Sequence, residues 1–254
     1  PPARRRSPSV LLKMGLVALL VLALLIPLGM IRTVLRERLG RRDAAIAEIT
    51  STWGEAQVVA GPVLVVPYRY SYKTWKEQIV AGRVERAEVL ETKVARAYFL
   101  PAALEVEGDL SPSVLYRGIY RAVVYRGRLT LSGTFRPPSF EEWKIAPEDV
   151  LWEDAVVAVG VSDLRGAQGA LTLRWDERDI ALTPGARVPD LAGVEARLKL
   201  EGPIAADAPF RLELTLNGSG GVRIAPAGDS TRVRLASTWP DPSFQGAFLP
   251  SERT

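Results

Sequence analysis

The sequence feature that most constrains the fold is an apolar run of eighteen residues, 14–31, which contains no charged side chain. As a helix rising about 1.5 Å per residue, this run would be roughly 27 Å long, close to the thickness of the hydrocarbon core of a bilayer. Residues 10–12 extend the run, and Lys13 can reach the headgroups with its long side chain. Pro27 lies late in the run, where a membrane helix tolerates it. We therefore predict one transmembrane helix over residues 10–31.

Two alternatives compete with an uncleaved membrane anchor. A cleaved signal peptide would need a shorter apolar region with a small-x-small cleavage site directly after it. The nearest such site, at residues 45–47, lies well downstream of the apolar run. A buried core helix is the second alternative, and the length of the run argues against it. An anchor is the interpretation that the sequence favours.

Charge does not orient the predicted helix. The basic side chains that flank the run are Arg4, Arg5, Arg6 and Lys13 before it and Arg32, Arg36, Arg38, Arg41 and Arg42 after it. The positive-inside rule counts Lys and Arg near the helix ends and does not separate the two orientations for such a balanced pair of flanks. Because a larger domain follows the run, an export anchor is the simplest arrangement. It would make residues 1–9 a basic cytoplasmic N-terminus.

Residues 32–57 are predicted to extend the helix as an amphipathic stalk. Leu35, Leu39 and Ile46 recur near helical spacing, with charged residues between them. Glu37 and Arg41 are four residues apart and can pair on one helix face. A helix lying on the lipid surface is an alternative interpretation of the same pattern.

From residue 58 the hydrophobic period becomes that of β-strands. We predict strands at residues 58–60, 63–66, 68–73, 94–100, 104–110, 119–125, 128–135, 156–161, 170–175, 194–200, 210–216, 221–225 and 231–238. Turn signals separate them, among them Gly61-Pro62, Pro67, Gly127 and the glycine-rich 217–221, which we interpret as a hairpin connection. Many short strands at this spacing predict a mainly β, sandwich-like or barrel-like domain over residues 58–254.

One internal similarity bears on that domain. Residues 129–140 read LTLSGTFRPPSF and residues 233–244 read VRLASTWPDPSF, with five of twelve positions identical. Two related β halves would explain the similarity. Chance likeness between two strand-and-turn units would explain it equally well.

The absence of Cys and His removes most familiar catalytic and metal chemistry. Without them the chain has no thiolate nucleophile, no Ser-His or Cys-His pair and none of the usual zinc ligands. The acidic pairs at 141–142, 148–149 and 153–154 are adjacent in sequence and are expected to solvate the surface. The glycine cluster at 217–221 lacks the lysine of a phosphate loop. We therefore predict no catalytic, cofactor-binding or metal-binding residue and expect no enzyme; a cryptic hydrolase without His or Cys is the alternative.

The net charge of +4 and the pI of about 9.5 suit an anionic membrane surface, a cell-wall polymer or nucleic acid equally well. The Tyr and Arg residues within 116–128 could bind an anionic strand. Alternating Tyr and Arg residues on a strand are more typical of a solvated face with aromatic support. We expect no nucleic-acid partner.

Several stretches are typical of one protein family: LLIPLGMIRTVLRER at 24–38, GPVLVVPY at 61–68, RGIYRAVVYRGRLTLSGTF at 117–135, VSDLRGAQG at 161–169 and STWPDPSFQGAFLP at 237–250. The last is the most specific, because its spacing of Trp, Pro and Phe is unusual for a turn. Through these stretches the chain resembles the inner-membrane protein CreD family of Gram-negative bacteria, which is linked to cell-envelope integrity and colicin tolerance.

The resemblance implies an N-terminus in the cytoplasm, one membrane helix and a large periplasmic domain. It also implies further membrane helices, and since this sequence ends before any such helices we expect it to be a fragment. The expected partners are the lipid bilayer, envelope proteins and those absent C-terminal helices. The resemblance implies a role in envelope integrity and stress response. A periplasmic binding module for lipid, peptide or a peptidoglycan fragment is the alternative.

Overall fold

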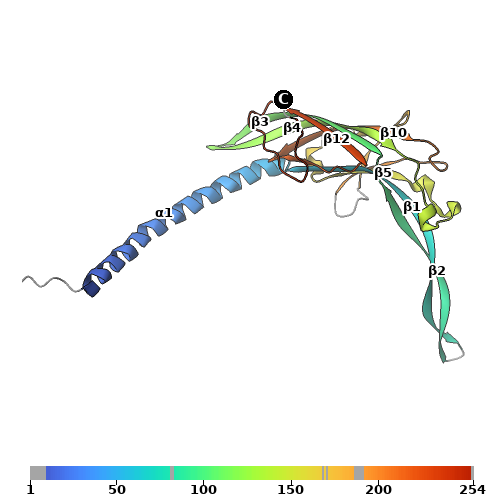
Figure 1. Ribbon diagram of the computed structural model, residues 1–254, viewed down its shortest axis with the longest axis horizontal. Helices are drawn as coiled ribbons and strands as arrows, with labels where there is room; N and C mark the ends of the chain where they lie inside the picture. Colours follow the sequence, from blue (N-terminus) through green and yellow to red (C-terminus); the bar gives the residue numbers. More distant parts are fainter. Residues whose placement is uncertain (1–9, 81–82, 168, 170, 186–191, 253–254) are drawn as a thin grey trace, which may run out of the picture. The chain divides into compact units, whose positions relative to one another are not determined.

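The computed structural model describes residues 10–80, 83–167, 169, 171–185 and 192–252 (Figure 1). The chain forms two compact units. One unit combines the segment up to Ile49 with residues 116–121, and the other combines residues 50–115 with residues 122–254. The predicted basic segment 1–9 lies outside the described residues.

The predicted transmembrane run and stalk form a single helix, α1, from Val10 to Trp53 (Figure 1). The helix includes Pro27 and is long and apolar enough to cross a membrane, and its most apolar window is fully exposed. The predicted pair forms, with Arg41 Nη2 2.6 Å from Glu37 Oε1. The helix ends at Trp53, within the predicted stalk segment 32–57.

The first unit also contains residues 116–121, at the turn between strands β3 (Ala103–Arg117) and β4 (Tyr120–Phe135). Gly118 has a φ of +59°, a left-handed conformation that favours glycine in a turn. Arg117 forms an ion pair with Glu48 of α1. This unit therefore has a contact between the helix and the turn.

The second unit contains two mixed β-sheets. The first sheet has the strand order β11-β1-β5-β9-β8, and β2 also pairs with β1. Its strands are β1 (Gln57–Val80), β2 (Arg83–Phe99), β5 (Val156–Val161), β8 (Thr183–Pro184), β9 (Gly193–Arg197) and β11 (Val222–Ile224). β1 pairs antiparallel with β2 and β5 and parallel with β11.

The second sheet has the order β12-β3-β4-β10-β6-β7. The strands not yet given are β6 (Thr172–Trp175), β7 (Arg178–Ala181), β10 (Ala208–Ser219) and β12 (Ser230–Ser237). β10 pairs antiparallel with β4 over its whole length, and β12 pairs parallel with β3. Among its described residues the unit also has four short 3-10 helices: η1 (Glu141–Trp143), η2 (Pro147–Asp149), η3 (Trp152–Asp154) and η4 (Leu164–Gly166).

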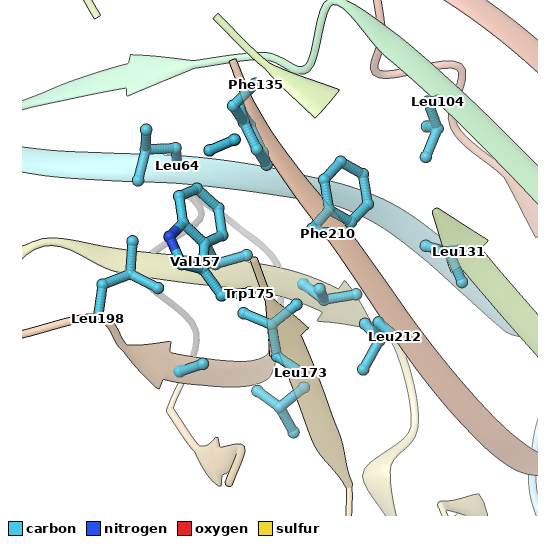
Figure 2. Packing of buried hydrophobic residues seen from close by; sticks show 14 of the residues in the cluster. Leu64, Leu104, Leu131, Phe135, Val157, Leu173, Trp175, Leu198, Phe210 and Leu212 are labelled. Atoms are coloured by element: carbon cyan, nitrogen blue, oxygen red, sulfur yellow. The ribbon is translucent and has the colours of Figure 1, made fainter. Parts of the chain in front are cut away.

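One hydrophobic core lies between the two sheets (Figure 2). Alternate residues of β10, from Phe210 to Leu216, are buried while their neighbours Arg211 and Glu213 are exposed. Phe135 packs against Trp175 and Phe210, with ring centroids 5.7 Å and 5.2 Å away. The sheets do not close into a barrel, so the sandwich-like form of the predicted mainly β fold is the one observed.

Several predicted turns are wrong because the chain stays extended through them. Gly61-Pro62 is a cis peptide within β1, at a shift in register against β5. Pro67 also lies within β1, beyond the last pair of the β5 ladder, where a missing N–H removes no bond to that strand. Gly127 lies within β4, and a Cβ there would come 3.0 Å from the Leu110 side chain, so glycine makes room for packing.

The predicted hairpin at 217–221 is also wrong. β10 runs on to Ser219, and β11 pairs parallel with β1 of the other sheet rather than with β10. The glycine-rich segment therefore connects the two sheets. Sequence also missed the short strands β7 and β8.

The two similar segments lie in β4 and β12 of the same sheet, each followed by an irregular Pro-containing stretch. Their burial differs, because Phe140 is 7% exposed and Phe244 is 38% exposed. The two sheets draw strands from all along the second unit. A relation between two halves stays a prediction.

Candidate functional site at the junction of helix and sheets

Buried polar side chains gather where α1 leads into β1. Among the described residues, the buried polar or charged ones are Gln57, Asp163, Glu195, Asn217 and Ser219, and four of them, all but Glu195, belong to this junction. Burying a polar group costs free energy unless hydrogen bonds replace its water. We call the hydrogen-bonded set around these four residues the junction.

The end of α1 depends on Gly54. Its φ is +142°, a conformation that L side chains rarely adopt, and its N–H donates to the Thr50 carbonyl at 2.8 Å. Ser219 then holds this turn from β10: its Oγ donates to the Gly54 carbonyl at 2.9 Å and its N–H to the Glu55 carbonyl at 3.2 Å. The helix therefore ends against the end of β10.

Strand β4 also contacts this turn. Trp53 Nε1 donates to the Tyr125 carbonyl at 3.2 Å. The Tyr125 hydroxyl donates to the Gly221 carbonyl at 2.8 Å, and burial raises the pKa of Tyr125 to about 12. The hydroxyl therefore stays protonated, and available as a donor, well above neutral pH.

Gln57, the first residue of β1, bridges the two sheets. Its Nε2 donates to the Asn217 carbonyl at 2.9 Å and to the Asp163 carbonyl at 3.4 Å, and its N–H donates to the Gly221 carbonyl at 3.1 Å. Its Oε1 is buried and has no hydrogen-bond partner among the described residues. Because Asp163 follows β5 and Asn217 lies in β10, one side chain contacts segments of both sheets.

Asp163 and Arg165 add charge to the junction. Arg165 Nε lies 2.9 Å from Asp163 Oδ1 and Nη2 lies 3.1 Å from Oδ2, a two-point contact that lowers the pKa of Asp163. The same carboxylate accepts the N–H groups of Glu55, at 3.1 Å, and of Arg165, at 3.0 Å. Arg165 Nη1 also donates to the Ser51 carbonyl at 3.3 Å, which places a cation at the C-terminus of α1.

Together these contacts tie the last turn of α1 to both sheets. The groups involved are backbone carbonyls and N–H groups, the Gln57 amide, the Trp53 indole N–H, the hydroxyls of Tyr125 and Ser219, and the ion pairs of Arg165 with Asp163 and Glu55. Such a set can hold two elements in a fixed relation, and it offers no pair of a nucleophile and a base. The junction therefore connects the last turn of α1 to segments of both sheets.

A second polar and aromatic cluster lies on the arm that β1 and β2 form beyond the sandwich (Figure 1). The rings of Tyr70 and Tyr72 are 5.9 Å apart, and the Tyr72 hydroxyl donates to Glu91 Oε2 at 2.7 Å. Lys76 Nζ lies 2.5 Å from Glu91 Oε1, and Lys93 Nζ lies 4.9 Å from the centre of the Tyr72 ring. These contacts join the two strands outside the hydrophobic core.

Aromatic rings continue from the arm toward η1. Tyr68 stacks on Trp143 with ring centroids 6.3 Å apart, and Phe140 lies beneath, 6.0 Å from Tyr68 and 5.7 Å from Trp143. Trp143 is 48% exposed and Tyr70 is 37% exposed. The cluster therefore presents aromatic faces to solvent.

The structure keeps the predicted acidic pairs apart, on η1, η2 and η3, and most of these side chains are exposed. Within the described ranges, no three Asp or Glu side chains gather as a metal site would require. Of the Tyr and Arg residues in 116–128, Tyr125 turns into the junction and Arg117 pairs with Glu48.

Sequence reasoning missed the junction residues Gln57, Asp163 and Arg165. The one local signal was Asp163 two residues before Arg165, since Asp163 caps η4 by accepting the Arg165 N–H. The other contacts join residues 106 and 160 positions apart, which no local pattern reveals.

The fold and the junction define a class of protein: a β domain of two sheets carried on one long N-terminal helix that is apolar enough to span a membrane. The chain belongs to the CreD family, since the family model described as inner membrane protein CreD matches residues 9–254. It is similar to the inner membrane protein CreD of Escherichia coli (strain K12), with 28% identity over 235 residues, 92% of this chain and 50% of that protein. The chain thus spans about half the length of this curated relative. No solved structure matches the chain.

The matching family model confirms the family that the sequence stretches indicated. Because this is an inner membrane family, a lipid bilayer is the environment that the apolar helix α1 suits.

Proposed function

We propose that the chain is a non-enzymatic envelope protein, held in the inner membrane by α1, whose β domain lies in the periplasm and supports envelope integrity or the response to envelope stress. The observation that carries this proposal is the junction, where an exposed apolar helix passes directly into a β domain through buried hydrogen bonds to both sheets. A flexible linker would have served if the helix were only a tether.

The junction gives the proposal a physical mechanism. Because Ser219 and Trp53 connect the last turn of α1 to β10 and β4, a force or displacement on either sheet would act on that turn. Arg165 and Asp163 extend the connection to the segment after β5. A protein that reports on or supports the envelope would need such a connection between its domain and the membrane.

The absence of enzymatic activity is part of the proposal. It is supported by the character of the buried polar groups at the junction, which bond backbone atoms and one another rather than facing a pocket. The hollow on the second sheet, bordered by Glu107 and Arg234, is shallow, and these two side chains face each other at 3.7 Å. Neither place resembles the buried pair of acids with shifted pKa values that hydrolysis would need.

Cysteine labelling in intact cells tests the location of the domain. The chain has no native Cys, so single substitutions at Ser9, Ser113 and Ser139 give clean reporters, the last two at exposed positions of the β domain. Ser219 is unsuitable because its hydroxyl belongs to the junction. A membrane-impermeant thiol reagent should label the Ser113 and Ser139 variants and not the Ser9 variant. Labelling of Ser9 alone would place the domain in the cytoplasm and refute the envelope role.

A second candidate function, a periplasmic binding module, is favoured by the aromatic faces of Tyr70 and Trp143. Tyr70 stacks on Tyr72 and Trp143 stacks on Tyr68, and such exposed rings can bind the apolar faces of sugars in a peptidoglycan fragment. Quenching of Trp fluorescence by soluble peptidoglycan fragments, lost in a Tyr70→Ala/Trp143→Ala double variant, would support it. Fragments that leave the fluorescence of the wild-type chain unchanged at millimolar concentration would refute it.

A further inference from the structure

Five arginines follow the apolar run of α1 within eleven residues. They are Arg32, Arg36, Arg38, Arg41 and Arg42, which we call the arginine collar. All five side chains are exposed, and with Glu37 and Asp43 they leave a net charge of +3 over residues 32–43. We propose that the arginine collar binds the phosphate groups of anionic phospholipids at the bilayer face on the side of the β domain.

The spacing along the helix places the collar at the headgroups. At about 1.5 Å per residue, Arg32, Arg36 and Arg38 lie about 1.5, 7.5 and 10.5 Å beyond Ile31, the last residue of the uncharged run. The headgroup layer of one leaflet is roughly 5–8 Å thick. Long arginine side chains can turn back toward that layer, so these three reach phosphates directly.

Contacts within the helix leave most of the collar without an internal partner. Arg41 pairs with Glu37 at 2.6 Å. The other four arginines have no ion-pair partner among the described residues. A guanidinium that no carboxylate engages is available to an external anion.

The spacing of the arginines along the helix also supports phosphate binding by the arginine collar. Arg32 and Arg36 are four residues apart, and so are Arg38 and Arg42, so each pair places like charges side by side on one helix face. Like charges at this spacing destabilise a helix in water. A phosphate between each pair would turn this repulsion into two charge-assisted contacts, which explains the arrangement.

The collar consists of arginine and contains no lysine. The planar guanidinium binds phosphate through two parallel hydrogen bonds, whereas an ammonium acts as a point charge. The ligand chemistry is therefore a phosphodiester or phosphate anion. A lipid is the favoured source because the collar adjoins the membrane span, and free phosphate is the source that an experiment must separate from it.

This inference rests on the membrane span of the proposed function and not on the periplasmic location or the envelope role. It can fail separately. A chain that does not enter a bilayer would refute the anchor itself, while an inserted chain without lipid preference would refute only the collar site.

Lipid selectivity of the full chain in phosphatidylcholine bilayers tests the proposal. Spin-labelled phosphatidylglycerol and spin-labelled phosphatidylcholine are added in turn, and the fraction immobilised by the protein is measured by electron paramagnetic resonance. We expect a preference for phosphatidylglycerol of about threefold or more at low salt, falling as NaCl screens the charges. Equal immobilisation of the two lipids would overturn the proposal.

Matched variants assign the preference to the collar. Arg36→Gln/Arg38→Gln/Arg42→Gln should abolish most of it, whereas Arg69→Gln/Arg174→Gln/Arg178→Gln removes the same charge from exposed sites in the β domain and should leave it unchanged. Equal effects of the two triple variants would overturn the proposal. The preference for phosphatidylglycerol is also measured in inorganic phosphate and in NaCl of equal ionic strength. A larger loss of this preference in phosphate would overturn the proposal, because the site would then bind free phosphate.

Discussion

Gly54 lies so close to Asn217 that a Cβ on Gly54 would come within 2.4 Å of the Asn217 carbonyl oxygen. The contact joins the residue after α1 to the strand β10, and the neighbouring Gly218 is equally close to Tyr125, whose hydroxyl would lie 2.4 Å from a Cβ. Two glycines therefore allow three backbone segments to meet at the junction. Glycine is required at position 54 for two reasons: the close contact with Asn217 and the φ of +142°.

Gly54→Ala should destabilise the β domain strongly. Backbone strain at such a φ costs about 1–3 kcal/mol, and relief of the clash would also break the hydrogen bond from Ser219 Oγ to the Gly54 carbonyl. We expect a loss of about 3 kcal/mol in the free energy of unfolding of the full chain, measured by denaturant titration in detergent micelles. Gly202→Ala is the control, because nothing lies within 4 Å of a Cβ there, and it should change stability by less than about 0.5 kcal/mol.

Asp163→Asn should weaken the junction in a pH-dependent way. At pH 7 the variant should lose about 1–2 kcal/mol of unfolding free energy, because the buried carboxylate accepts charge-assisted hydrogen bonds from the Glu55 and Arg165 N–H groups; its contact with the exposed Arg165 guanidinium is screened by solvent and adds less. Because Arg165 lowers the pKa of Asp163 in the folded chain, the carboxylate stabilises the fold fully above its ordinary value of 3.8. That contribution is lost as the pH falls below this value through the lowered pKa.

Denaturant midpoints of wild type and variant between pH 7 and pH 2 measure this effect. The two curves should converge in the acid range. Asp207→Asn, at an exposed carboxylate, should follow the wild type at every pH. A constant gap between wild type and Asp163→Asn down to pH 2 would contradict an electrostatic role.

Local sequence patterns could predict individual elements of this fold, but not the contacts that join these elements. β10 could be predicted because Phe210, Leu212 and Leu214 alternate with charged residues on a half-buried surface. Proline at 67 and the glycines within 217–221 are locally typical of turns, but Pro67 lies within β1 and β10 stays extended to Ser219, so the chain turns only at Gly220, whose φ is +70°. The junction could not be predicted, because Gln57 meets Asp163 and Asn217 only after both sheets have formed.

Glu91→Gln should loosen the arm without changing global stability. Lys76 and Tyr72 both bond the Glu91 carboxylate and lower its pKa, and they link β1 to β2 outside the core. We expect amide hydrogen exchange in residues 70–76 to accelerate by roughly threefold at neutral pH, with an unchanged melting temperature, because arms with few buried contacts open locally.

Glu88→Gln provides the matched control for the arm. It removes a single ion pair, from Lys73 Nζ to Glu88 Oε2 at 3.2 Å, between two exposed side chains. Such a pair contributes little to stability, so exchange should stay near the wild-type rate. If both variants exchange alike, the network around Glu91 has no special role.

Phe140→Ala and Phe244→Ala should differ sharply in cost, although the two residues occupy matching places in the similar segments. Phe140 is buried and its ring lies 5.4 Å from Phe99 and 5.9 Å from Trp152, so truncation should cost about 3–5 kcal/mol of unfolding free energy. Phe244 is 38% exposed, and its truncation should cost about 1 kcal/mol. Denaturant titration of both variants measures the two costs. Equal, large costs would show that the second segment packs as the first does, which would favour two related halves over a chance likeness.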